Sequence, residues 1–471
     1  MRLLFLKHGW SRRMRRKRMG NNSSRAGPAL CPHLLPQEQA EISRLFNILS
    51  SQRSGSGSDA APRCFLLKAV QGHVGEALPP EMVRLLYAGM RRSEPIGPRE
   101  GISHEQLLNF LAHLLKGVAE ERGLLLLRMI SDTPGPISAA EVQKFAEVLV
   151  GSVAQVLTHR QEQRGWTRPE VPDSTPRVRE LATQMLSELK LQDGRKLRGP
   201  QKLDGLCDQA ALEDWVFRTP LVGTFLSLLV YGALLGRHWT PEPAPLVPER
   251  QVEPGHDFAS LLDVLSVIFI NSHLPPEWRH RWHLLFASDL HGCSFAQLCG
   301  RITHRGPCLL LLQDHDGHVF GGFSSCSWEV KPQFQGDASC FLFSVSPHMA
   351  VYPCTGYNNH YMYLNRGQQT IPNGLGMGGQ HHYFGLWIDE DFGKGHSKAK
   401  PTCTTYNSPQ LSGREDFCFD RMEVWAVGNN PSMLSTNNKS ILDVDPEAQA
   451  LLQISGRSFH SQGVREPPEN A

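Results

Sequence analysis

Apolar residues in the first half of the chain recur with the spacing of amphipathic helices. Between residues 37 and 163, Ile42, Leu45, Phe46 and Leu49 fall on one face of a helix. Similar apolar stripes recur near residues 82–90, 105–115 and 141–157. The pattern predicts a helical region over residues 20–165. A second helical region follows over residues 166–240, and it opens with a loop rich in proline and charge.

Two stretches of this helical half resemble EF-hand loops that have lost calcium ligands. In the clearer one, Gly135 and Glu141 occupy loop positions six and twelve. Ile130 and Pro134 then fall at positions one and five, where calcium needs oxygen ligands. Asp132 and Glu141 alone cannot complete the coordination shell. We therefore expect a helix–loop–helix scaffold that holds no metal.

The most hydrophobic segment of the chain runs from Leu221 to Gly236, between two arginines. It is shorter than the about twenty apolar residues that a membrane-spanning helix needs. The length favours a helix buried in a protein core. Several prolines follow, and they predict a linker over residues 241–258.

Beyond this linker, short apolar runs alternate with turns that contain Gly, Pro and Asn. The spacing predicts a helix over residues 260–269 and the start of another at Trp282. Regularly spaced short strands separated by such turns are typical of a β-sandwich. The predicted strands cover residues 307–312, 319–323, 326–330, 341–345, 383–389 and 422–427.

A glycine-rich stretch precedes the fifth of these strands. Residues 374–379 read GLGMGG, which matches a dinucleotide-binding fingerprint by spelling. That fingerprint requires a strand before it and a helix after it, whereas the following residues, YFGLWID, suit a strand. We therefore interpret the stretch as a glycine-built turn that feeds a buried strand.

The order and spacing of these motifs resemble a TLDc domain over roughly residues 259–428. The matching segments are WHLLF at 282–286, HGCSF at 291–295, FGGF at 320–323, GLGMGG with YFGLWID, and EVWA at 423–426. The resemblance implies two antiparallel sheets with a few attached helices. It also implies a non-enzymatic adaptor of mTOR signalling at the lysosomal membrane. In that role the TLDc domain would bind protein partners such as the peripheral sector of the vacuolar ATPase.

Charge is distributed unevenly along the chain. Residues 1–18 carry eight basic and no acidic side chains, so the remainder is mildly acidic although the whole chain has a net charge of +2. Nucleic-acid binding is therefore not indicated. Residues 1–19 are interpreted as a basic leader or alternative start, because residues 19–24 read MGNNSS and fit the N-myristoylation motif. If Met19 is the working start, Gly20 carries a lipid that anchors the protein to the membrane.

Candidate catalytic and metal-binding side chains do not form a recognisable motif. His315, His318, His381 and His382 lie near aspartates, but without the spacing of a metal site, and turn chemistry accounts for Asp314 to Gly317 equally well. We predict no catalytic residue, metal or cofactor.

The alternative function is oxidation resistance through a reactive thiol. Cys293, Cys326 and Cys403 are the candidates, and such a thiol needs a lowered pKa and exposure to solvent. The eleven cysteines, an odd number scattered along the chain, are typical of a protein from a reducing compartment. Overall the sequence predicts an α+β multidomain protein: a helical N-terminal region with degenerate EF-hand-like units, then a TLDc β-sandwich with flanking helices and a C-terminal helix.

The C-terminal helix belongs to a tail over residues 429–471. Asp445 is suited to its N-cap and Gly456 to its end, and Leu451, Leu452 and Ile454 form its apolar side. A helix of about ten residues is unstable alone in water, so this side must dock on a partner or on the TLDc domain. The three apolar residues are our candidate partner-binding residues.

We predict that Leu451→Asp combined with Leu452→Asp weakens partner binding and leaves the melting temperature of the TLDc domain nearly unchanged. Pull-down and thermal melting of the same preparation measure the two effects. A large loss of thermal stability would instead assign the helix to the core of the domain.

Overall fold

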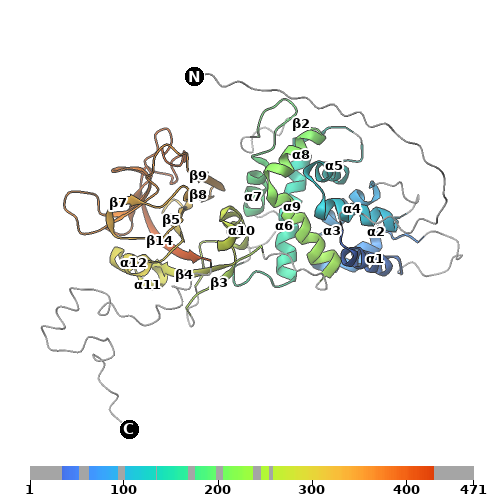
Figure 1. Cartoon of the computed structure of the whole chain (residues 1–471), viewed down its shortest axis with the longest axis horizontal. Helices are drawn as coiled ribbons and strands as arrows, with labels where there is room; N and C mark the ends of the chain where they lie inside the picture. Colours follow the sequence, from blue (N-terminus) through green and yellow to red (C-terminus); the bar gives the residue numbers. More distant parts are fainter. Residues whose placement is uncertain are drawn as a thin grey trace, which may run out of the picture.

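The computed structural model describes residues 34–51, 63–93, 101–133, 135–167, 176–197, 205–236, 246–253 and 258–428. Within these ranges a helical half and a half rich in β-strands lie side by side (Figure 1). Four predicted site residues, Gly20, Leu451, Leu452 and Ile454, lie outside the described residues, as does the predicted C-terminal helix.

The described part of the helical half consists of helix–loop–helix units that follow one another along the chain. The first two units pair α1 (Pro36–Ser51) with α2 (Leu67–Val74), and α3 (Pro80–Arg91) with α4 (His104–Lys116). The next two pair α5 (Ala119–Ile130) with α6 (Ala139–His159), and α7 (Pro176–Leu186) with α8 (Gln209–Arg218). A short 3-10 turn, η1 (Gly75–Ala77), connects the first two units.

The loops of these units join two by two through short antiparallel pairings. Phe65 pairs with Ile102 between the first two units. In the next two units, β1 (Ile137–Ser138) pairs with β2 (Leu206–Cys207). Ile137 stands at loop position eight when Glu141 is counted as position twelve. If its partner Cys207 is also counted as position eight, Ala211 falls at position twelve. If Phe65 and Ile102 are counted as position eight of their loops, Ala69 and Gln106 fall at position twelve.

These twelfth positions bear directly on calcium, because a calcium-binding loop uses a bidentate glutamate there. Among the four loops only Glu141 is a carboxylate at that position. Its Oε2 accepts hydrogen bonds from the backbone N–H and the hydroxyl of Ser138, at 2.8 and 2.7 Å. The bond from the Ser138 backbone is the main reason that the pKa of Glu141 is lowered. The carboxylate therefore caps α6.

We predict that the full-length chain does not bind calcium in the micromolar range, because the loops lack the ligand set of a sensor EF-hand. Titration calorimetry with calcium chloride should give only the heat of dilution, and a calcium sensor protein serves as the positive control. Micromolar binding that Glu141→Gln abolishes would contradict this prediction.

The most hydrophobic segment forms α9 (Pro220–Leu229) and continues as a π-helical stretch, η2 (Val230–Leu235). Val222, Phe225, Leu226 and Leu229 are fully buried, which confirms the prediction of a core helix. In the part of the chain that the structure describes, no single helix is long and apolar enough to cross a bilayer. The pair formed by α8 and the α9–η2 segment passes that test on length and composition, but it is bent by 89°.

The β-rich half contains two sheets that share β14 (Asp416–Val427), and their strands pair antiparallel except for β3 with β4. In the first sheet, the second part of β14 pairs on one edge with β4 (Arg281–Ala287). On its other edge, most of β14 pairs with β5 (Cys308–Asp314). The strands that follow β5 outward are β6 (Val319–Ser324), β8 (Phe341–Ser346) and β9 (Ala350–Pro353). The first part of β14 pairs with β13 (Lys394–His396), followed by β12 (Tyr383–Asp389), β11 (Gly374–Gln380), β10 (Met362–Asn365) and β7 (Lys331–Gln335).

Both faces of the sheet around β5 are buried. Leu310 and Leu312 point into the core between the two sheets, where they meet residues such as Met377. Leu309 and Leu311 point the other way, into a core that is continuous with the helical half. Three short helices, α10 (Val264–His273), α11 (Ser288–His291) and α12 (Phe295–Ile302), pack near the strands, and α10 lies between the two halves (Figure 1).

Several local predictions for this half were wrong. The helix predicted to start at Trp282 is the strand β4, because apolar residues on both of its faces hide the alternation of a strand. The segment 326–330 forms only one isolated bridge, between Trp328 and Thr303. Within the predicted linker 241–258, residues Glu249–Gln251 form β3, which pairs in parallel with β4. The helix predicted over 260–269 is α10, which begins and ends four residues later.

The glycine-rich stretch is itself the strand β11, so its interpretation as a turn was wrong. It pairs with β12 from Gly374↔Asp389 to Gln380↔Tyr383. A Cβ atom on Gly376 would lie 2.6 Å from ring carbons of Phe384 and 3.0 Å from Trp387, because both rings lie across the strand. The glycines thus let aromatic side chains of the neighbouring strand lie flat on the backbone.

We predict that Gly376→Ala lowers the free energy of unfolding by about 1–3 kcal/mol, because the added methyl group overpacks against the rings, and therefore lowers the melting temperature. The substitution should remove no cofactor. Gly300→Ala is the matched control, because a Cβ atom at that position in α12 meets nothing within 4 Å. Thermal melting of the two variants checks this. Equal melting temperatures would show that the ring contacts of Gly376 do not determine its identity.

Candidate functional site

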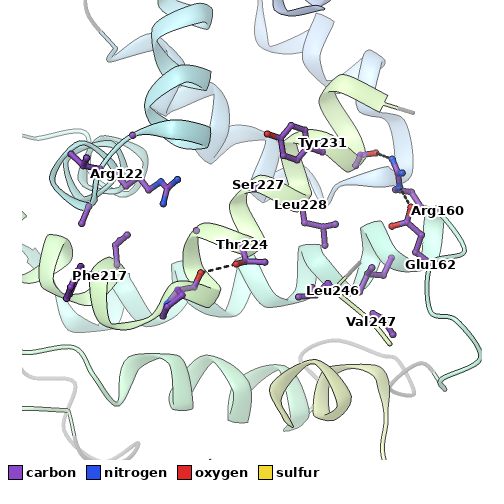
Figure 2. Close-up of a pocket in the computed structure, with 18 of the residues that line it drawn as sticks. Arg122, Arg160, Glu162, Phe217, Thr224, Ser227, Leu228, Tyr231, Leu246 and Val247 are labelled. Carbon is purple, nitrogen blue, oxygen red and sulfur yellow. Dashed lines mark hydrogen bonds and ion pairs between the residues drawn. The ribbon is translucent and has the colours of Figure 1, made fainter. Parts of the chain in front are cut away.

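A groove of about 1090 Å³ opens between α5, α6, α8 and α9 in the helical half (Figure 2). Its lining comes from the end of the α4–α5 connection, from the facing sides of these helices and from residues 246–247. This volume is in the range of sites that bind small ligands. We take the groove as the candidate site, because it combines this volume with a lining that is mostly apolar.

Apolar side chains form most of the groove wall. Leu157 and Val216 are buried, whereas Leu228 and Tyr231 are half-buried and present a side to the opening. Two apolar side chains remain largely in solvent at the edge: Val118 is 63% exposed and Phe217 is 75% exposed. Exposed apolar groups beside a hollow are a feature of ligand or partner sites.

Two arginines of the groove are engaged with neighbouring groups, Arg122 at one place and Arg160 at another. The Arg122 guanidinium donates hydrogen bonds to the Leu114 carbonyl, at 3.1 Å from Nε, and to the Leu115 carbonyl, at 2.9 Å from Nη2. Burial lowers the pKa of Arg122. A Cβ atom on Gly223 would lie 3.2 Å from Nη1 of Arg122, so the absence of a side chain on Gly223 lets the guanidinium pack on α9.

At the other end of the groove, Arg160 is held by an ion pair. Its Nε lies 2.6 Å from Oε1 of Glu162, and its Nη1 donates to the Gly232 carbonyl at 3.5 Å (Figure 2). Gly232 packs directly on Val156 of α6. The groove therefore combines an apolar wall with charged side chains, of which Arg122 bonds to backbone carbonyls and Arg160 pairs with Glu162. The apolar wall is suited to a largely apolar ligand.

The histidines and aspartates considered as metal ligands separate into two hairpins. Asp314 accepts from the Ser412 hydroxyl at 2.6 Å and lies 3.3 Å from Nδ1 of His318, in the β5–β6 turn. His381 and His382 lie in the β11–β12 turn, where His381 packs beside the ring of Phe334. Across the described ranges, no group of three or more His, Cys, Asp or Glu side chains is placed to hold a metal ion.

The candidate thiols differ in their surroundings. Cys403 is buried and Cys326 is half-buried, and burial raises the pKa of both thiols. A raised pKa lowers the fraction of thiolate, which is the reactive form. Cys293 is exposed. The structure brings these three cysteines into no common site.

Sequence reasoning did not find the groove. Its lining residues come from stretches more than a hundred positions apart, such as Val118 and Leu246, and none belongs to a motif. The only signals were the small residues Gly223 and Gly232 within the hydrophobic segment, which permit the close approach of Arg122 and Val156.

Comparison with known proteins finds relatives that match 96% of this chain. A family model described as the TLDc domain matches residues 256–428. The MTOR-associated protein MEAK7 of Homo sapiens is 62% identical, over 96% of this chain and 100% of its own length. The protein of the same name from Gallus gallus is 50% identical, over 96% of this chain and 99% of its own. Oxidation resistance protein 1 of Bos taurus is 33% identical, over 40% of this chain and 21% of its own length.

We predict that Arg122→Ala destabilises the protein by about 1–3 kcal/mol, because two carbonyls at the end of α4 lose a charged donor. Thermal melting measures the loss. Arg84→Ala, at an exposed position on α3, is the matched control and should change the melting temperature little. A similar melting temperature for both variants would contradict the assigned role of Arg122.

Proposed function

This chain belongs to the family of the MTOR-associated protein MEAK7, and on that premise we propose that it is a non-enzymatic signalling adaptor in mTOR signalling. The proposed place of action is the cytoplasmic face of the lysosomal membrane, with a further pool in the cytoplasm. The proposed anchor is a myristoyl group on Gly20, and the proposed partners of the TLDc domain include the peripheral sector of the vacuolar ATPase.

The observation that carries this proposal is similarity to relatives named for association with MTOR along nearly the entire chain, in the helical half as well as the TLDc domain. An adaptor needs surfaces for partners, and two kinds are present. One is the groove. The other is the end of the TLDc sheet that carries Tyr357 and Tyr383, which are 79% and 61% exposed. Tyrosine is enriched where proteins bind each other.

These two tyrosines lie at the same end of the sheet. The loop that carries Tyr357 is fastened there because Thr355 donates its backbone N–H to the Thr405 carbonyl at 2.8 Å, and Gly379 donates its N–H to the Thr405 hydroxyl. Gly379 lies one residue before the end of β11, whose last residue, Gln380, pairs with Tyr383. Rigid backbone beneath exposed aromatic rings favours binding, because little conformational entropy is lost on docking.

Oxidation resistance remains the alternative, and the similarity of the TLDc region to oxidation resistance protein 1 favours it. This function would require a reactive thiol, and Cys293 is the exposed one among the three candidates. A profile of thiol reactivity at neutral pH separates the two functions. Labelling of Cys293 much faster than a free cysteine would support the alternative, whereas slow labelling of all thiols would support the adaptor.

We predict that Gly20→Ala shifts the protein from the membrane fraction to the soluble fraction, because it removes the myristoylation site. Fractionation of cells that express the chain from Met19, with mass spectrometry of the N-terminus, measures both lipid and location. Asn21→Ala is the matched control, since it changes the neighbouring residue and keeps the glycine. If Gly20→Ala remained in the membrane fraction to the same extent as the parent chain, the proposed lipid anchor would be contradicted.

A further inference from the structure

We propose that the groove between α5, α6, α8 and α9 binds the myristoyl chain of Gly20 from the same molecule when the protein is away from a membrane. This inference rests on the lipidation in the proposed function. It goes further by giving the acyl chain a binding site in the helical half.

The chemistry of the groove suits a saturated acyl chain. Its wall presents Val118, Val216, Phe217, Leu228, Tyr231 and Leu246. Two of the charged groups beside them already have partners: Arg122 donates to the two carbonyls of α4, and Arg160 is paired with Glu162. A ligand without hydrogen-bonding groups can therefore enter without leaving these groups unpaired. A polar ligand would have to compete with existing bonds.

The path of the chain brings its N-terminal part to the same place. The described residues begin at Leu34, which is buried, and the backbone N–H of Leu35 donates to Oε2 of Glu38 at 2.9 Å. The other oxygen of Glu38 lies 3.0 Å from Nζ of Lys116. The next residue, Gly117, lines the groove. The start of the described chain is thus fixed beside the groove edge.

Gly20 is close enough along the sequence to reach the groove. Leu34 is fourteen positions after Gly20, and an extended chain of that length spans up to about 46 Å. Such a tether raises the effective concentration of the acyl chain at a nearby site to the millimolar range or thereabouts. Even a site of modest intrinsic affinity would then be filled.

A single acyl chain also needs such a site. Its membrane association is marginal, with a constant of about 10⁴ M⁻¹, so a lipidated protein spends part of its time off the membrane. During that time an exposed chain of fourteen carbons is strongly unfavourable in water. A groove that competes with the bilayer makes anchoring reversible, and a partner that occupies the groove would release the lipid.

The first test uses a synthetic peptide, myristoyl-Gly-Asn-Asn-Ser-Ser-Arg, which corresponds to residues 20–25. It is titrated below its micelle concentration into the full-length Gly20→Ala chain, with the acetylated peptide as reference. Ser227→Trp places a large side chain in the groove. Lys144→Trp introduces the same side chain on the outer side of α6, where Lys144 pairs with Glu81, and is the matched control.

We expect the myristoylated peptide to bind the parent and the Lys144→Trp variant, and at least tenfold more weakly to Ser227→Trp. The acetylated peptide should not bind. If Ser227→Trp melts at a much lower temperature, Thr224→Phe, at an exposed position in the same groove, replaces it. No binding to the parent, or equal binding to all variants, would overturn the inference.

The second test uses the chain made from Met19 together with an N-myristoyltransferase. Filling the groove should raise the fraction bound to phosphatidylcholine–phosphatidylserine vesicles several-fold in Ser227→Trp, and Lys144→Trp should match the parent. Equal vesicle binding by all three would overturn the inference and leave the lipid anchor in place. Absence of myristate from the chain isolated from cells would overturn both proposals.

A peptide of residues 443–455 tests the other possible occupant of the groove, the predicted C-terminal helix. If it displaces the myristoylated peptide from the groove and binds more tightly than it, the groove belongs to the C-terminal helix, and the acyl assignment fails. Failure of this peptide to compete supports the acyl chain.

Discussion

The packing of Trp425 against the helical half is the contact on which the rest of the structure depends. Trp425 lies on β14, the strand shared by both sheets, and its ring is 4.9 Å from that of Trp166. Trp166 also meets Trp282 of β4 at 5.4 Å and donates its indole N–H to the Pro248 carbonyl. Beside them Glu423 is buried and accepts from the Ser260 hydroxyl, the Leu261 backbone and the Trp425 indole. Burial raises the pKa of Glu423, because the charged carboxylate loses its contact with water. The three donors supply the hydrogen bonds that a buried carboxyl group needs.

This contact explains why the sequence of the β-rich half reads differently from that of a two-layer sandwich exposed on its outer faces. Leu309 and Leu311 would face solvent in such a sandwich, but here they belong to the core that extends into the helices. Strands buried on both faces are continuous apolar runs without alternation. The same burial made β4 look helical, since Trp282, Leu285 and Phe286 have helical spacing. What the sequence could predict was therefore the existence of most strands, and what it could not predict was which faces were covered.

The bounds of one strand could be predicted from its own residues and their neighbours. The strand over residues 383–389 was predicted with its observed bounds, because its aromatic residues follow a glycine-rich stretch and precede polar ones. The glycine-rich stretch itself was misread, because the reason for its glycines lies across the sheet in the rings of Phe384 and Trp387. The groove was missed for the same reason. Arg122 and Gly223 are about a hundred positions apart in the sequence, and only the tertiary fold brings the Arg122 guanidinium next to Gly223.

The helix–loop–helix units show how a scaffold of this kind keeps its shape with side chains in place of metal ligands. Ser103 and Gln106 form a capping box at the start of α4, Ser138 and Glu141 form another at α6, and Asp208 accepts from the Ala211 backbone at α8. Each cap satisfies backbone N–H groups that the first turn of a helix leaves unpaired. These caps use polar atoms of the loop itself. The units are then held by their paired loops and their shared core, so a ligand in the groove would act on a framework that is already formed.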